Sequence, residues 1–205
     1  MAIISNATTI ADAGAFSVGL GSMVHIKTLT ASSSATLSFV HGTADVVLDS
    51  TYPIYKFEFI NCHPATDDIS FQFQGSIDAG SNYNVAITST HFRATHGEDG
   101  SSEALAYITS GDLAQGTGFQ LLAGSVGNDA DQSLGGELFI YNPSSTTFVK
   151  HFTGNFQSIA HSNRTNNQYP AGYFNTTSAL DAFQFKFSSG NIDDGKIKLY
   201  GIKDS

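Results

Sequence analysis

The stretches IYKFEFI (54–60) and ISFQFQG (69–75) decide the fold class, because each alternates large apolar residues with polar ones. In the first, the aromatic residues fall on one face, whereas Lys56 and Glu58 fall on the other. Successive side chains of a β-strand point to opposite faces, so a period of two predicts strands with one buried and one wet face. Such strands are typical of antiparallel sheets.

The same period extends along much of the chain and predicts about ten strands joined by Gly/Asn/Asp loops. The other expected strands are TLSFV (36–40), ADVVLD (44–49), YNVAITSTHFRAT (83–95, one longer strand or a bent pair), GELFIYN (136–142), FVKHF (148–152), NFQSIA (155–160), FQFKF (183–187) and KIKLYGI (196–202). We expect turns at HGT (41–43) and NPSS (142–145). The best helix candidate, SEALAYITSGDLAQ (102–115), is interrupted by Ser-Gly and predicts at most two short turns.

This pattern predicts an all-β protein: an antiparallel β-sandwich of jelly-roll type with an irregular N-terminal arm. Residues 1–33 show no sustained period, and we interpret them as an arm or edge segment. Residues 34–205 then form one β-sandwich domain. The sixteen Phe and eight Tyr supply ample surface for a core.

The composition excludes several classes of partner. Lys plus Arg is 9 and Asp plus Glu is 18, so 9 − 18 gives a net charge of −9. A surface of this sign repels phosphate backbones and anionic headgroups, so we expect no nucleic-acid partner. No apolar run approaches the roughly 20 residues that span a bilayer, so we expect no membrane insertion. The N-terminus lacks the basic and apolar regions of a signal peptide, which predicts assembly in a cytoplasm.

Acidic and amide residues of three loops are the candidate ligand contacts. These possible ligand-facing residues are Asp67, Asp68, Asp78, Asn191, Asp193 and Asp194. Their spacing is not that of a dedicated calcium loop, and Asp and Asn also stabilise turns with their own side chains. The closing stretch SSGNIDDGKIKLYGI (188–202) echoes FQFQGSIDAGSNY (71–83). We interpret both stretches as hairpin turns in preference to ligand sites.

No catalytic or metal-binding motif stands out. The chain has no HExxH, CxxC or GxSxG, so we expect no catalytic residue, no cofactor, no metal and no enzymatic activity. Cys62 is the single cysteine; we interpret it as a half-buried small residue. His91 and His96 are five apart, which places them on opposite strand faces, and exposed or capping histidines are favoured over ligands.

Several stretches resemble a family of small proteins of marine tailed bacteriophages, which are uncharacterised or labelled structural. They include YKFEFINCHPATDD, QGSIDAGSNYNV, YNPSSTTFVKHF, AGYFNTTSALDAFQFKFSSGNID and GKIKLYGIK. The resemblance runs from about Leu29 to Lys203 and is most distinctive at the closing stretch. It implies a virion component rather than an enzyme and carries over no catalytic residues.

The leading hypothesis is therefore a bacteriophage virion structural protein, an exterior β-sandwich assembled in the host cytoplasm. Its expected partners are copies of itself and other virion proteins. We slightly favour a place in the tail or tail fibre, where the protein would also contact a host-surface glycan, over a place in the head. The alternative within this class is a capsid decoration protein. From another class, a carbohydrate-binding or carbohydrate-active domain stays open, although the absence of Trp weakens it.

Overall fold

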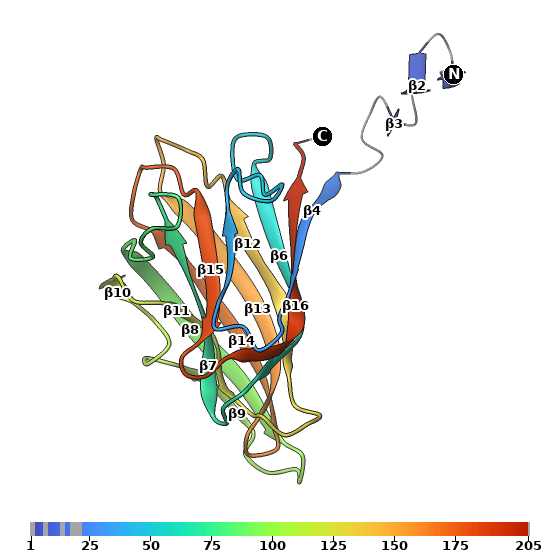
Figure 1. Ribbon diagram of the computed structural model, residues 1–205. Helices are drawn as coiled ribbons and strands as arrows, with labels where there is room; N and C mark the ends of the chain where they lie inside the picture. The colour runs from blue at the N-terminus through green and yellow to red at the C-terminus, as the bar shows by residue number, and fades with distance from the viewer. Residues whose placement is uncertain (1–2, 6–7, 13–14, 17–21, 205) are drawn as a thin grey trace.

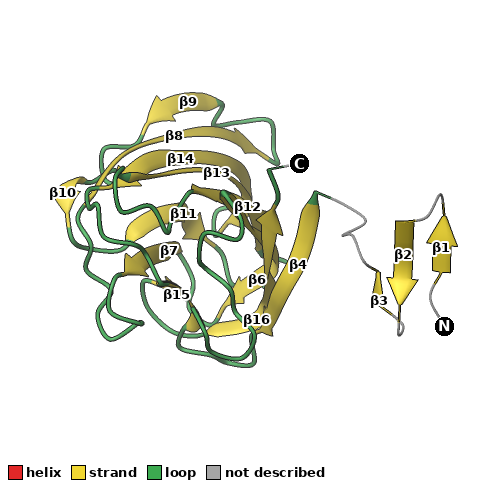
Figure 2. Ribbon diagram, turned by 90° about the horizontal axis from the view of Figure 1, so that it is seen from above, coloured by secondary structure: helices red, strands yellow, loops and turns green. Residues whose placement is uncertain are grey.

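The computed structural model describes residues 3–5, 8–12, 15–16 and 22–204 of the chain. Within these residues all regular structure is β-strand, as the alternating sequence predicts. Figures 1 and 2 show a strongly curved large sheet that wraps around a smaller one. The strands of the large sheet, in spatial order, are β4 (Met23–Thr30), β16 (Ile192–Ile202), β6 (Ile54–Pro64), β12 (Leu134–Tyr141), β13 (Lys150–Ala160), β14 (Arg164–Phe174), β8 (Ile87–Gly97) and β9 (Ala104–Tyr107), with β10 (Ala114–Gly116) also paired to β8.

The small sheet contains β11 (Gln120–Val126), β7 (Ile69–Ser76), β15 (Ala182–Phe187) and β5 (Leu37–Val40). The two sheets are joined through one pair of residues, Val126 and Ala160. All pairings between strands are antiparallel. The fold is therefore a sandwich that is nearly closed along one side.

The strand order is that of a jelly roll. The large sheet begins β4-β16-β6-β12 and the small sheet, read from its free edge, is β5-β15-β7-β11. When the strands β8 to β10 and β13 to β14 are left aside, the chain passes from one of these sets to the other at every step except β7 to β11. This alternation between two sheets is the double Greek key of jelly rolls. Two insertions, β8 to β10 and β13 to β14, lengthen the large sheet beyond β12.

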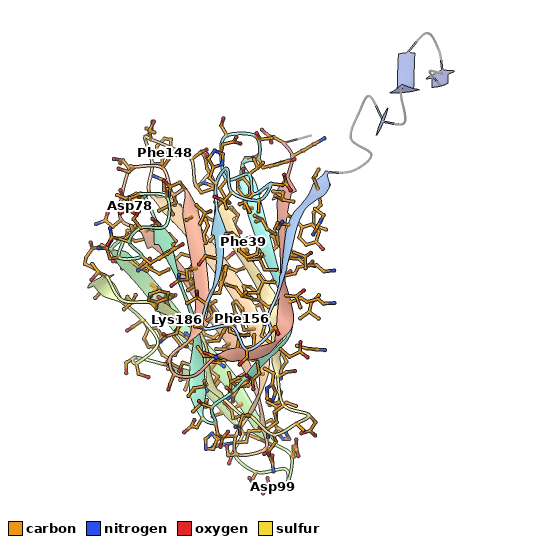
Figure 3. The ribbon with its side chains drawn as sticks, in the orientation of Figure 1. Phe39, Asp78, Asp99, Phe148, Phe156 and Lys186 are labelled. Atoms are coloured by element: carbon orange, nitrogen blue, oxygen red, sulfur yellow. The ribbon has the colours of Figure 1, made fainter. Side chains whose placement is uncertain are left out.

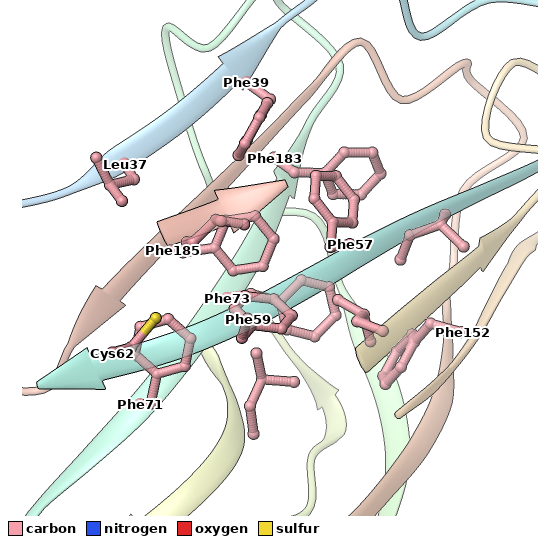
Figure 4. Close-up of a cluster of buried hydrophobic side chains, with 14 of the residues drawn as sticks. Leu37, Phe39, Phe57, Phe59, Cys62, Phe71, Phe73, Phe152, Phe183 and Phe185 are labelled. Carbon is pink, nitrogen blue, oxygen red and sulfur yellow. The ribbon is translucent and has the colours of Figure 1, made fainter. Parts of the chain in front are cut away.

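Aromatic side chains fill the space between the sheets (Figure 4). The buried phenylalanines are Phe39, Phe57, Phe59, Phe71, Phe73, Phe152, Phe156, Phe174, Phe183, Phe185 and Phe187. Their rings meet mostly edge to face; Phe57 and Phe185, for example, have centroids 5.0 Å apart at an interplanar angle of 61°. Burying each such side chain stabilises the fold by about 1.5–3 kcal/mol before entropy is counted. The predicted Phe faces are thus the core.

The predicted hairpin at residues 188–202 is wrong. β15 pairs with β7 and β5, whereas β16 pairs with β6 and β4, so residues 188–191 cross from the small sheet to the large one. The echoing stretch is a crossover as well, because β7 and β8 belong to different sheets. Shortly after the crossover at residues 188–191, Gly195 of β16 has a φ of 118°, and a Cβ there would lie 2.6 Å from the Cα of Cys62 on β6. Glycine is therefore required at this close approach of two strands.

Two other local predictions are also wrong. Residues 102–115 form no helix, because β9 and β10 both pair with β8 and a turn at Gly111 separates them. Residues 44–49 form no strand, because Ala44 and Asp45 both have left-handed φ angles, of 49° and 67°. The buried Val46 and Leu48 of this segment still reach the core.

Residues 1–33, expected to be an arm or edge segment, include β4, which lies at the edge of the large sheet. Before it, β1 (Ile3–Ser5), β2 (Thr8–Asp12) and β3 (Ala15–Phe16) form a separate three-stranded sheet in the order β1-β2-β3. Residues 17–21 lie outside the described residues.

Candidate functional site: the outer face of the extended sheet

The outer face of the large sheet carries a row of side chains that runs across six strands. Register places Glu58 of β6 beside Glu137 of β12, and Glu137 beside Asn155 of β13. On the far side, Tyr169 of β14 is opposite Phe92 of β8, which is opposite Tyr107 of β9. Because neighbouring strands are about 4.8 Å apart, this row is roughly 24 Å long. It passes from carboxylates through an amide to aromatic rings.

The aromatic end of the row is exposed. Phe92 stacks on Tyr169 with ring centroids 4.8 Å apart and an interplanar angle of 16°. Phe92 is 43% exposed, Tyr107 52% and Leu105 76%, and Leu105 lies two residues from Tyr107 on the same face of β9. We call these four residues the aromatic patch. Exposed large apolar side chains that adjoin one another mark binding surfaces, whereas scattered ones do not.

Amides form the middle of the face. Asn155, Gln157 and Asn167 line a depression of about 370 Å³, whose other walls include Glu58 and Glu137. Asn167 donates a hydrogen bond of 2.7 Å from Nδ2 to the hydroxyl of Tyr169, but its Oδ1 is buried and has no hydrogen-bond partner among the residues that the structure describes. Side-chain amides offer both donors and acceptors, which suits the hydroxyl groups of a neutral ligand.

Pro170 explains why the sheet is irregular at this point. The ladder between β13 and β14 is interrupted between the pairs Thr153–Ala171 and Phe156–Gln168. Proline has no backbone N–H to donate, and it is rare in the middle of a sheet. The interruption lies directly beneath Asn155 and Tyr169, at the centre of the face.

The two carboxylates of the row share one lysine. Lys56 Nζ lies 2.9 Å from Glu58 Oε1 and 2.9 Å from Glu137 Oε2, and 5.5 Å from the ring centroid of Phe139. The hydrogen bond from Lys56 holds the pKa of Glu58 below its usual value despite partial burial. A glycosidase of two carboxyl groups needs one with a raised pKa as general acid. Glu58, whose pKa is lowered, is ionised and therefore does not supply this general acid.

The six loop residues proposed from sequence do not form one site. Five of them, Asp67, Asp68, Asn191, Asp193 and Asp194, lie on neighbouring segments at one end of the sandwich, where Ala65 N donates to Asn191 O (3.0 Å). Asp78 lies at the opposite end (Figure 3).

The polar groups of these loops have local partners. Asp68 pairs with His161 (3.0 Å), and Asn191 Nδ2 donates to Ser33 O (2.9 Å). Asp193 accepts from Ser33, Asp194 from the amide of Gly195, and Asp67 from the amide of Asn128. Asp78 accepts from Ser76, Asn82 Nδ2 and Asn82 N, and these hydrogen bonds lower its pKa.

Cys62 and His91 are both buried more deeply than expected. Cys62 is fully buried on β6 rather than half-buried, and burial raises the pKa of its thiol to about 12. It therefore holds no thiolate at neutral pH. His91 is fully buried on β8, which contradicts the expected exposed or capping role, although His96 is exposed on the opposite face as predicted. Among the described residues no group of three or more His, Cys, Asp and Glu is placed to hold a metal ion.

The sequence interpretation missed the outer face because two of its strands were not recognised. β14 contains RTNNQYPAGYF, which is polar on both faces, and β9 is exposed on both faces. The available signal was the pair of aromatic residues in QYPAGY (168–173) beside HFRAT (91–95).

Comparison with protein-family models, curated proteins and solved structures finds no match for this chain. In the part of the chain that the structure describes, no helix has the length and apolar character needed to cross a membrane.

Proposed function

We propose that this chain is an exterior structural protein of a bacteriophage virion that touches host-surface glycan through the outer face of β12, β13, β14, β8 and β9. The jelly roll supplies the rigid body, and copies of the chain and other virion proteins are its partners. The observation that carries the proposal is the aromatic patch beside the row of amides. Stacked and exposed rings next to convergent polar groups are the features of a site that binds sugars by their apolar faces and hydroxyls.

The sequence resemblance to structural proteins of tailed bacteriophages supports the virion part of the proposal. The geometry supports glycan contact by the sheet face rather than by the Asp-rich loops, because the loop carboxylates already accept hydrogen bonds locally. It also favours binding over hydrolysis, since Lys56 forms ion pairs with both carboxylates of the row and the pKa of Glu58 is lowered rather than raised.

The virion part is tested on particles that contain the chain. Antibody labelling and cryo-microscopy should place it on the particle exterior, at the tail, in few copies. Labelling over the whole head in high copy number would indicate a decoration protein instead. Absence from purified particles would overturn the proposal.

A further inference from the structure

The two arginines of the chain lie on the same inner face of the large sheet. Arg93 is on β8 and Arg164 is on β14, and these strands are direct neighbours. Side chains of β8 alternate, so Arg93 points to the same side as the buried Ser89 and His91. In the ladder Arg93 is opposite Gln168 and Arg164 is opposite Gly97, four residues further along. Both arginines are half-buried.

Neither guanidinium meets a carboxylate in the described part of the chain. The positively charged partners in the ion pairs observed there are Lys56, His96 and His161. Arg164 donates one hydrogen bond, from Nε to Ser162 Oγ at 2.7 Å, and Arg93 makes no side-chain hydrogen bond to any described residue. A guanidinium carries five N–H donors, so the described residues accept from almost none of the donors of these two side chains.

This placement is unfavourable for the empty protein. Burial lowers the pKa of Arg93, and the positive charge of Arg164 lowers it further. A partly desolvated charge without a counter-ion costs stability. The chain has eighteen acidic residues from which a partner for Arg93 could have come, yet its neighbours across the ladders are the small Ala106 and the amide of Gln168.

The groups around Arg93 leave its donors free for a ligand. Gln168 is occupied, because its Oε1 accepts from Gly124 N (2.9 Å) and its Nε2 donates to Gly124 O (3.3 Å). Between the two arginines Thr95 donates to Asn166 Oδ1 at 3.0 Å, which fixes both side chains. At the far end, Glu98 and Asp99 line a cleft of about 650 Å³ with Arg164 and oppose a negative ligand there.

We propose that Arg93, assisted by Arg164, binds an oxyanion (a carboxylate, sulfate or phosphate group) on the inner face of β8 and β14. Guanidinium groups bind such oxyanions through paired N–H···O bonds. The bound oxyanion supplies the negative charge that no described carboxylate provides for these two arginines. The site is on the opposite face of the sheet from the aromatic patch, so it is independent of the glycan contact proposed above.

The test is calorimetric titration of the purified protein with sodium sulfate, phosphate and glucuronate at constant ionic strength. We expect saturable binding of at least one of them, with affinity at least tenfold lower in Arg93→Gln and in Arg164→Gln. Lys196→Gln removes one exposed positive charge of β16 and serves as the matched control, with unchanged affinity. The preferred anion identifies the source of the group.

A second readout separates binding from a structural role. In the absence of anion, Arg93→Gln should unfold at the same or a higher urea concentration than the wild type, because it removes an uncompensated charge. In saturating anion the wild type should gain stability and the variant should not. Absence of binding by the wild type, equal affinity in all three variants, or destabilisation of anion-free Arg93→Gln would overturn the proposal.

Discussion

The inner face of the large sheet is filled in two different ways. Opposite the small sheet, phenylalanines such as Phe57 pack on Phe185. Along β8 and β14, beyond the core residues Ile87 and Phe174, most of the buried side chains are polar. Here Ser89, His91, Gln120 and Gln168 hydrogen-bond to one another or to backbone. Apolar packing tolerates approximate geometry, whereas each buried polar group needs its own partner. The first region specifies the jelly roll, and the second supports the extension that carries both proposed sites.

The largest expected effect breaks the apolar region. Phe185→Ala removes a fully buried ring that contacts Phe39, Phe57, Phe59 and Phe71, and should lower the free energy of unfolding by about 3–5 kcal/mol. Urea denaturation measures this loss. The control is Phe148→Ala, which removes a ring that is 70% exposed and should change stability by less than about 0.5 kcal/mol. Equal losses would show that the buried rings are not the core.

A smaller effect is expected in the polar region. Gln168→Ala removes an amide that joins β14 to Gly124, Ser158 and His91, and should cost about 1–3 kcal/mol because buried partners are left unsatisfied. Gln184→Ala, which removes one hydrogen bond to Ser38 near the surface, is the comparison and should cost less. The same urea titration decides; a smaller loss for Gln168→Ala than for Gln184→Ala would contradict this assignment.

The polar region should also be sensitive to acid. Burial lowers the pKa of His91 below 6.5, its ordinary value; Arg93 lowers it further, while Gln168 and Asp112 oppose the shift. The unfolded chain therefore takes up a proton first as pH falls below about 6.5, and stability decreases until the folded state also protonates. Urea midpoints between pH 7.5 and 5 should fall in the wild type and fall less in His91→Gln. Parallel curves would remove His91 as the cause.

The smallest expected change in stability lies on the outer face. Phe92→Ala removes half of the Phe92–Tyr169 stack and should cost less than about 1 kcal/mol. Because the ring is 43% exposed, its main loss should be in ligand binding. A Tm shift as large as that of Phe185→Ala would indicate that the patch is structural.

The sequence predicted the apolar region well and the polar region poorly, for a physical reason. Phe57 and Phe185 alternate with polar neighbours, so their strands carry a period-two signal that hydrophobicity reveals. β14 buries Asn166 and Gln168 on its inner face, and its Pro170 argues locally against a central strand. Local sequence patterns also do not distinguish a hairpin within one sheet from a crossover between two sheets. A loop of Ser, Gly and Asn is compatible with both. Partners across the sheet, such as Tyr107 opposite Phe92, exist only in the fold.

Binding of the purified protein to an array of neutral and charged glycans tests the central claim most directly. The wild type and Phe148→Ala should bind the same glycans, whereas Phe92→Ala should lose at least tenfold in affinity while remaining folded. Absence of binding by the wild type, or undiminished binding by Phe92→Ala, would contradict the assignment of the outer face as the host-contacting surface.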